Sequence, residues 1–111
     1  DKFTYSWEFF VFVIVYIGLG PLAEEVFFRV VLFNSLRNEL NFWFSMLISS
    51  FIFAILHSGI GHFFFAFVSG CFLSYVYEKY KNIPVIVLIH SLLNIPAVIY
   101  VILSSINIFK Y

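Results

Sequence analysis

The stretch PLAEEVFFR, residues 21–29, places two adjacent carboxylates and an arginine inside an otherwise apolar part of the chain. The largely apolar segment WEFFVFVIVYIGLG, residues 7–20, precedes it, and VVLF, residues 30–33, follows it. A charged side chain inside a membrane-spanning helix costs about 2.5–3.5 kcal/mol on insertion scales, so such a residue is a functional candidate by default. Three of them within one short stretch indicate that the fold is organised around it.

The helical period gives these three residues different roles. Glu25 and Arg29 are four residues apart, so in a helix they lie on one face and can form an ion pair. Glu24 is rotated by about 100° from Glu25 and cannot share that pairing equally. We therefore expect Glu25 and Arg29 to be a structural pair and Glu24 to be the reactive carboxylate.

The composition indicates a lipid environment. Of the 111 residues, 63% are hydrophobic and 11% are charged, whereas a soluble domain is about half apolar and a quarter charged. Six basic and six acidic residues leave no net charge, which gives no indication of a nucleic acid partner. The single cysteine, Cys71, excludes an intrachain disulfide and a cysteine-based metal site. The chain begins with Asp1, and we expect residues 1–111 to be one core domain from a longer multi-span protein.

Four hydrophobic stretches predict the fold class. They cover residues 7–36, 42–56, 62–77 and 83–109, with polar turns at 34–41 and 78–82 and a short break at 58–61. A spanning helix needs about 20 mostly apolar residues. We therefore predict an all-α membrane protein, a bundle of about four transmembrane helices around a polar cavity.

The first stretch is longer than one membrane crossing and contains Gly18, Gly20 and Pro21. Proline removes a backbone donor and disfavours helix at the residue before it. The first helix should therefore be kinked or broken near Gly18–Pro21, with Pro21 opening the second part. Backbone groups freed there need protein or water partners, which predicts a wet pocket beside Glu24. Farther along, Ser69 and Gly70 should permit close helix contact.

Short connections make neighbouring helices antiparallel, so the two polar turns share one side of the membrane. That side carries Arg37, Lys79 and Lys81, and the other carries Lys2 and Lys110. The positive-inside rule then places the first side in the cytoplasm. We expect a multi-pass protein of a bacterial plasma membrane.

Polar residues in apolar context recur on later helices. His90 and Asn94 are four residues apart and face the same way, and His57 ends the second hydrophobic stretch. The simplest way to keep such groups out of lipid is to let them meet in one interior site. The predicted members of this site are Glu24, Glu25, Arg29, His57, His90 and Asn94.

These groups are suited to hydrolysis of an amide. A carboxylate held away from bulk water can act as a general base at neutral pH, and an imidazole beside it can hold the other side of a water molecule. The tetrahedral intermediate then needs hydrogen-bond donors at its oxyanion. His90 and Asn94, one helical turn apart, could supply two of them.

Three motifs resemble those of the CPBP family of intramembrane proteases, which includes the type II CAAX prenyl endopeptidases and the bacteriocin-processing or Abi proteins. EEVFFR, residues 24–29, resembles its EExxxR motif; FAILH, residues 53–57, resembles FxxxH; and HSLLN, residues 90–94, resembles HxxxN. The resemblance implies that Glu24 and His57 activate the water, and that His90 and Asn94 stabilise the oxyanion. It implies that Glu25 and Arg29 support the site structurally.

The resemblance also implies a glutamate-dependent reaction without a cofactor or a catalytic metal. The partners would be membrane lipid and a protein or peptide substrate; a prenylated C-terminus and a leader peptide are both compatible. Family members usually have more helices than the four expected here.

Other interpretations remain open at this point. Glu24, His57 and His90 could ligate zinc, although HExxH spacing is absent. The polar residues could also belong to a non-catalytic immunity, scaffold or transport protein that retains the cavity. His62 matches no motif position and is interpreted as an interfacial residue. A flat four-helix arrangement leaves open how His57 and His90 reach the same depth.

Overall fold

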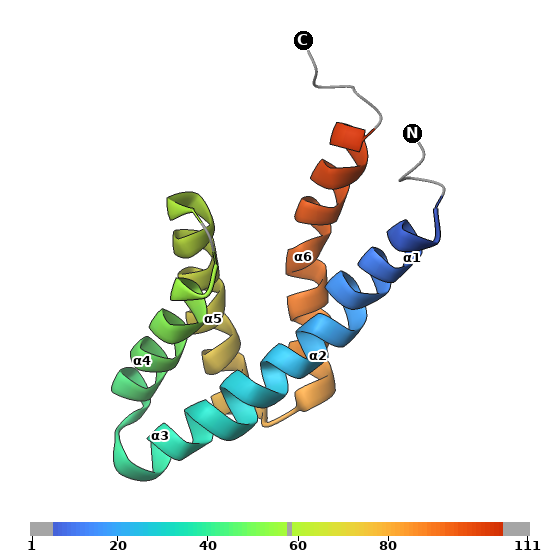
Figure 1. Cartoon of the computed structure of the whole chain (residues 1–111). Coiled ribbons are helices and arrows are strands. Elements are labelled where there is room, and N and C mark those ends of the chain that lie inside the picture. The colour runs from blue at the N-terminus through green and yellow to red at the C-terminus, as the bar shows by residue number, and fades with distance from the viewer. Residues whose placement is uncertain (1–5, 58, 106–111) are drawn as a thin grey trace.

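The computed structural model describes residues 6–57 and 59–105, and all regular structure within them is helical. The predicted all-α class is confirmed. Residues 7–39 form one continuous helix, followed by three more (Figure 1). The elements are α1 (Trp7–Ile14), η1 (Val15–Leu19), α2 (Gly20–Glu25), η2 (Val26–Phe33), α3 (Asn34–Glu39), α4 (Phe42–Ile55), α5 (Ile60–Tyr80) and α6 (Ile83–Ser105).

The irregularity expected near Gly18–Pro21 takes the form of a π-helical segment, η1, and the helix continues through Pro21. The N–H group of Gly20 bonds to the carbonyl of Val15, five residues earlier. A Cβ atom at Gly20 would lie 2.6 Å from that carbonyl oxygen, so a residue without a side chain is needed there. The π-helical turn thus accommodates the proline without ending the helix.

The first polar turn is shorter than the sequence indicated. Residues 34–39 are helical as α3, and Leu40 and Asn41 make the turn. Asn41 caps the next helix, because its side-chain oxygen accepts the N–H of Phe44 at 3.0 Å. The polar residues of 34–39 therefore extend the helix beyond its apolar part instead of ending it.

The second polar turn is shorter in the same way. Helix α5 continues to Tyr80, and Lys81 ends it in the left-handed conformation, with φ of 50°. Arg37 and Lys81 both contact Glu78, with closest N–O distances of 2.9 and 3.4 Å. The two turns therefore lie on one side, as predicted; Lys2 and Lys110, assigned to the other side, lie outside the described residues.

Three helices of the described chain are long and apolar enough to cross a membrane: residues 7–39, 60–80 and 83–104. The fourth, α4, has 14 residues and is about 21 Å long, less than a hydrocarbon core of about 30 Å. The hydrophobic stretch at residues 42–56 thus forms a shorter helix than a full span.

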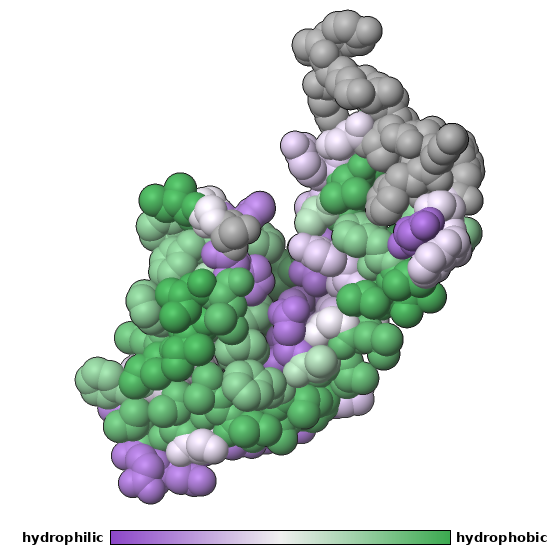
Figure 2. Space-filling model, viewed as in Figure 1, coloured by the Kyte–Doolittle hydropathy of each residue, from purple (hydrophilic) through white to green (hydrophobic). Residues whose placement is uncertain are grey.

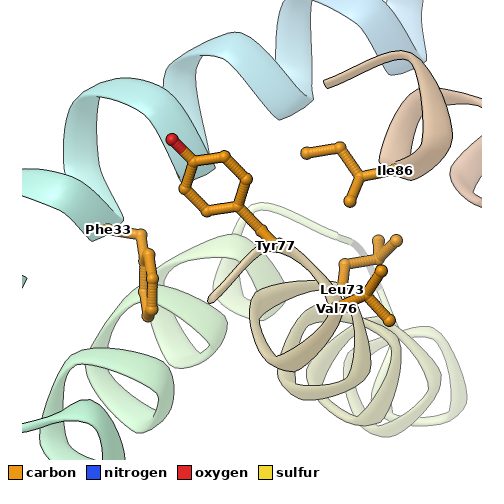
Figure 3. Packing of buried hydrophobic residues seen from close by; sticks show 5 residues of the cluster. All are labelled: Phe33, Leu73, Val76, Tyr77 and Ile86. Atoms are coloured by element: carbon orange, nitrogen blue, oxygen red, sulfur yellow. The ribbon is translucent and has the colours of Figure 1, made fainter. Parts of the chain in front are cut away.

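The helices form two arms that meet at one end (Figure 1). Helices α4 and α5 pack along each other in one arm, and α6 packs against η1 and α2 in the other. A core cluster joins the arms where they meet, and its side chains come from η2, α5 and α6 (Figure 3). Its buried members are Phe33, Leu73, Val76, Tyr77 and Ile86.

Gly70 lets α5 approach α4 closely, as predicted. A Cβ atom at this position would lie 3.1 Å from the Cβ and Oγ atoms of Ser50 and 3.3 Å from a ring carbon of Phe53. Contacts this short leave no room for a larger side chain. The arm formed by α4 and α5 therefore depends on small residues, as is usual between membrane helices.

Candidate active site

The hollow between the two arms collects the polar side chains (Figure 2). One cavity in it, of about 340 Å³, is lined by residues of the long first helix, of α6 and of the segment that follows α4. The four residues proposed from the sequence to act on the substrate all contribute to its wall. Its lining is Val15, Tyr16, Gly20, Glu24, His57, His90 and Asn94.

Glu25 is fully buried and holds two partners. Its Oε2 atom lies 3.2 Å from Nε of Arg29, which is the ion pair predicted from their spacing. Its Oε1 atom lies 2.6 Å from Nδ1 of His90 on α6. The sequence did not indicate this second contact, because 65 positions separate the two residues.

Arg29 connects this pair to the other arm. Its side chain is only 2% exposed, and its Nη2 atom donates a hydrogen bond of 2.9 Å to the carbonyl of Gly70 on α5. The guanidinium carbon lies 5.3 Å from the centre of the Phe53 ring on α4, within the range of a cation–π contact. One arginine therefore contacts a carboxylate, a backbone carbonyl and an aromatic face from three elements.

Glu24 has the separate environment that the helical period predicted. Its side chain is 39% exposed and lines the cavity, whereas that of Glu25 is fully buried. Its Oε2 atom lies 3.5 Å from Nε2 of His90. Glu24 is thus the carboxylate that water and a ligand can reach.

His90 lies between the two carboxylates, and its contact with Glu25 determines that Nδ1 carries a proton. Carboxylates accept hydrogen bonds, so the short contact with Glu25 requires a proton on Nδ1 of His90. The Nε2 atom then faces Glu24. His90 therefore has one ring nitrogen held by the core and one directed to the cavity.

His57 lies two residues after the end of α4 and lines the same cavity. Its Nδ1 atom lies 2.8 Å from the carbonyl oxygen of Phe53 and must donate to it, which leaves a lone pair on Nε2 of the neutral ring. The Phe53 ring lies between the imidazoles, with centroid distances of 4.7 Å to His57 and 5.8 Å to His90. Because α4 is short, it ends beside His90, and this resolves the question of depth.

Asn94 and Ser91 on α6 bond to the irregular part of the first helix. Asn94 donates from Nδ2 to the carbonyl of Tyr16 at 2.8 Å. Ser91 donates from Oγ to the carbonyl of Ile17. Sequence reasoning missed Ser91, although Pro21 provided a signal: the carbonyl four residues before a proline loses its helical partner.

A second cavity, of about 360 Å³, adjoins the first and shares Tyr16, His57, His90 and Asn94 with it. His62 is exposed and lies on this second cavity, away from the Glu24 side. The other residues that line this second cavity are mostly apolar or small: Phe53, Leu56, Phe65, Ala66, Ser69, Leu73, Leu93 and Ala97.

A zinc site would need several His, Cys, Asp or Glu side chains grouped around one point. Within residues 6–57 and 59–105, three or more His, Cys, Asp or Glu side chains nowhere come together as a metal site requires. Cys71 is a partly buried free thiol and contributes to neither cavity.

Comparison with known proteins places these motifs in one family. A family model described as "Type II CAAX prenyl endopeptidase Rce1-like" matches residues 6–96. Over 76 residues, 68% of this chain, the sequence is 36% identical to "Putative membrane peptidase YdiL" of Bacillus subtilis (strain 168). It is 33% identical over 76 residues to "UPF0177 protein YxdF" of Lactococcus lactis subsp. lactis (strain IL1403).

The aligned region covers 31% and 41% of these two relatives, so the chain spans less than half of their length. No solved structure matches the chain. The family match covers the EEVFFR, FAILH and HSLLN motifs, each of which contributes to the wall of one cavity. The resemblance inferred from the motifs is thereby confirmed. The chain belongs to the Rce1-like family of type II CAAX prenyl endopeptidases.

Proposed function

We propose that this protein is an intramembrane endopeptidase that hydrolyses a peptide bond with a water molecule activated by Glu24 and His57. The observation that carries the proposal is the shared cavity, on which Glu24, His57, His90 and Asn94 meet from the first helix, the segment after α4, and α6. Membership in a family of membrane peptidases supports the same class of reaction.

We assign water activation to Glu24 and His57, which line the cavity and can accept hydrogen bonds from a water molecule. The carboxylate of Glu24 is partly exposed, so a water molecule can reach it. The Nδ1–H group of His57 donates to the carbonyl of Phe53. The lone pair on Nε2 can then orient the same water molecule. The attacking oxygen would approach the peptide carbonyl carbon as its proton passes to Glu24.

Oxyanion stabilisation is assigned to His90 and Asn94. The Nδ1–H group of His90 donates a hydrogen bond to Glu25, so donation to an oxyanion requires a second proton, on Nε2. The charges then balance, because an imidazolium and Arg29 face two carboxylates. The amide of Asn94 has two N–H groups, of which Tyr16 takes one.

Over the whole reaction Glu24 neither gains nor loses a proton. The tetrahedral intermediate collapses when its C–N bond breaks, and Glu24 returns the proton to the leaving amine. The products are a carboxylic acid and an amine, and Glu24 is again a carboxylate. Glu25 and Arg29 take part in no step; they hold His90.

We favour the glutamate mechanism over a zinc mechanism. Peptide hydrolysis by zinc needs about three protein ligands around one ion, and Glu24, His57 and His90 are not grouped in that way. The same carboxylate and imidazoles are suited to direct action on water.

The proposed setting is a multi-pass protein of a bacterial plasma membrane. Three apolar helices of sufficient length support several crossings, and the two relatives come from bacteria. The proposed substrate is a protein or peptide that enters the hollow between the arms. Prenylated C-termini and leader peptides remain compatible with it.

The experiment compares wild-type protein with Glu24→Gln, both purified in detergent and incubated with a peptide library made from a bacterial proteome digest. New peptide termini, identified by mass spectrometry, should appear with wild type and fall by at least about 100-fold with Glu24→Gln. Glu39→Gln is the matched control, because Glu39 is exposed on α3 and lies on neither cavity.

Equal cleavage by Glu24→Gln and wild type would overturn the mechanism. No cleavage by a folded wild-type protein would favour the non-catalytic alternative, an immunity, scaffold or transport protein.

A further inference from the structure

Two successive carbonyls of the first helix lack their usual helical partners. Pro21 has no N–H group, so the carbonyl of Ile17 loses the donor four residues ahead. The N–H of Gly20 bonds to Val15 in the π-helical turn, so it is diverted from the carbonyl of Tyr16. Both carbonyls lie about two turns before Glu24, and a carbonyl without a partner is costly within a membrane.

Helix α6 supplies a donor to each of them. Asn94 donates to Tyr16, and Ser91 donates to Ile17, across 78 and 74 positions of sequence. The Ser91 hydroxyl also lies 2.9 Å from the carbonyl of Val87, the usual contact of a helical serine with its own preceding turn. The single hydroxyl proton is therefore shared between a local and a long-range acceptor.

These bonds set the position of the residue next to Ser91. His90 is 5% exposed, and its two ring nitrogens lie 2.6 and 3.5 Å from Glu25 and Glu24. Sliding or rotating α6 against the first helix would break the Ser91 bond and change both distances together. The register of the helices and the geometry of the histidine therefore depend on the same contact.

We propose that Ser91 is a positioning residue, whose hydroxyl binds the carbonyl left free by Pro21 and thereby holds His90 between Glu24 and Glu25. Its effect on turnover rests on the proposed peptidase function. Its effect on His90 does not, and the two are measured separately.

The first measurement is kinetic and uses the peptide that wild-type protein cleaves best in the library. Ser91→Ala should lower kcat by about tenfold with little change in KM, because a small displacement of a reacting group is costly while substrate contacts remain. Ser91→Thr keeps the hydroxyl and should restore most of kcat. Ser104→Ala, an exposed serine on the same helix, should behave as wild type.

The second measurement tests the link to Pro21. In Pro21→Ala the restored N–H can bond to the Ile17 carbonyl, so this carbonyl no longer depends on the serine hydroxyl alone for a donor. Ser91→Ala should then lower kcat by less than about twofold relative to the Pro21→Ala parent. A tenfold loss in both backgrounds would show that Ser91 does not act by supplying the donor that Pro21 lacks, and the proposal would fail.

The third measurement needs no substrate. In protein with ¹⁵N-labelled histidine, the Nδ1 proton that His90 shares with Glu25 should give a downfield proton resonance, assigned by its loss in His90→Gln. It should shift or broaden in Ser91→Ala, and remain in Ser91→Thr and Ser104→Ala. An unchanged resonance in Ser91→Ala would overturn the proposal. A shifted resonance in a protein that cleaves nothing would support the positioning and remove only the peptidase function.

Discussion

The Nδ1 atom of His90 lies 2.6 Å from Oε1 of Glu25, although the two residues are 65 positions apart. This contact joins the last helix to the first at a fully buried carboxylate. Glu25 is also paired with Arg29, so the histidine on the cavity is connected to the ion pair in the core. Stability and the geometry of the site are therefore linked through one side chain.

Arg29→Ala should strongly destabilise the fold. The substitution leaves Glu25 buried without its cation and removes the bond to the Gly70 carbonyl. Removing one member of a buried ion pair costs about 3–5 kcal/mol. Thermal unfolding in detergent should show a large decrease in Tm, while Lys79→Ala, at an exposed position of α5, should change it little.

A double-mutant cycle tests the same pair further. Glu25→Ala combined with Arg29→Ala should cost less than the sum of the two single substitutions, because no unpaired charge remains buried. Additive losses in unfolding free energy would show that the two charges do not stabilise each other.

Gly70→Val should separate α4 from α5. The added side chain would meet Ser50 and Phe53 at 3.1–3.3 Å from its first carbon alone, and overpacking of this kind costs about 1–3 kcal/mol. Gly61→Ala on the same helix is the control, because a Cβ atom there meets nothing within 4 Å. Equal Tm values for the two variants in detergent would contradict the close packing described.

His57→Gln should remove cleavage without unfolding the protein. His57 is exposed at the end of α4, so the fold depends on it little, whereas loss of a group that orients the water should lower kcat by about 10²–10⁴-fold. His62→Gln, on the neighbouring cavity only, should retain most of the activity. The peptide-library assay measures both, and wild-type turnover by His57→Gln would remove this residue from the mechanism.

Chelation should leave cleavage unchanged. The proposed reaction uses a carboxylate and imidazoles directly, so treatment with EDTA or 1,10-phenanthroline followed by dialysis should not lower kcat. Loss of activity on chelation, with recovery on adding zinc, would replace the glutamate mechanism by the zinc alternative.

Local spacing was enough to predict much of the site. The four-residue interval between Glu25 and Arg29 predicted their ion pair, and the 100° offset of Glu24 placed it on the cavity, because an α-helix fixes these directions within one turn. The predicted turns begin too early, because polar residues such as Asn34 and Glu78 are typical of helix ends but lie within α3 and α5. Their side chains instead bond between helices, Asn34 to Tyr77 and Glu78 to Arg37.

The contacts of His90 show where such reasoning stops. His90 was expected to share a site with Glu24 and Glu25 and to donate to an oxyanion beside Asn94, but the position of its ring between the two carboxylates was not predicted. The partner of a side chain on a distant helix depends on how far the two helices slide past each other. That offset is set here by bonds from Ser91 and Asn94 to the carbonyls near Pro21.

The sequence by itself determined that this protein is helical, membrane-embedded and built around a charged stretch, because hydrophobicity and the helical period act over a few neighbouring residues. Only the tertiary structure decided that α4 is short, how His57 and His90 reach the same depth, and that Ser91 contributes to the register. The reason is that these relationships depend on the packing of whole helices, a cooperative property that no single stretch of sequence encodes.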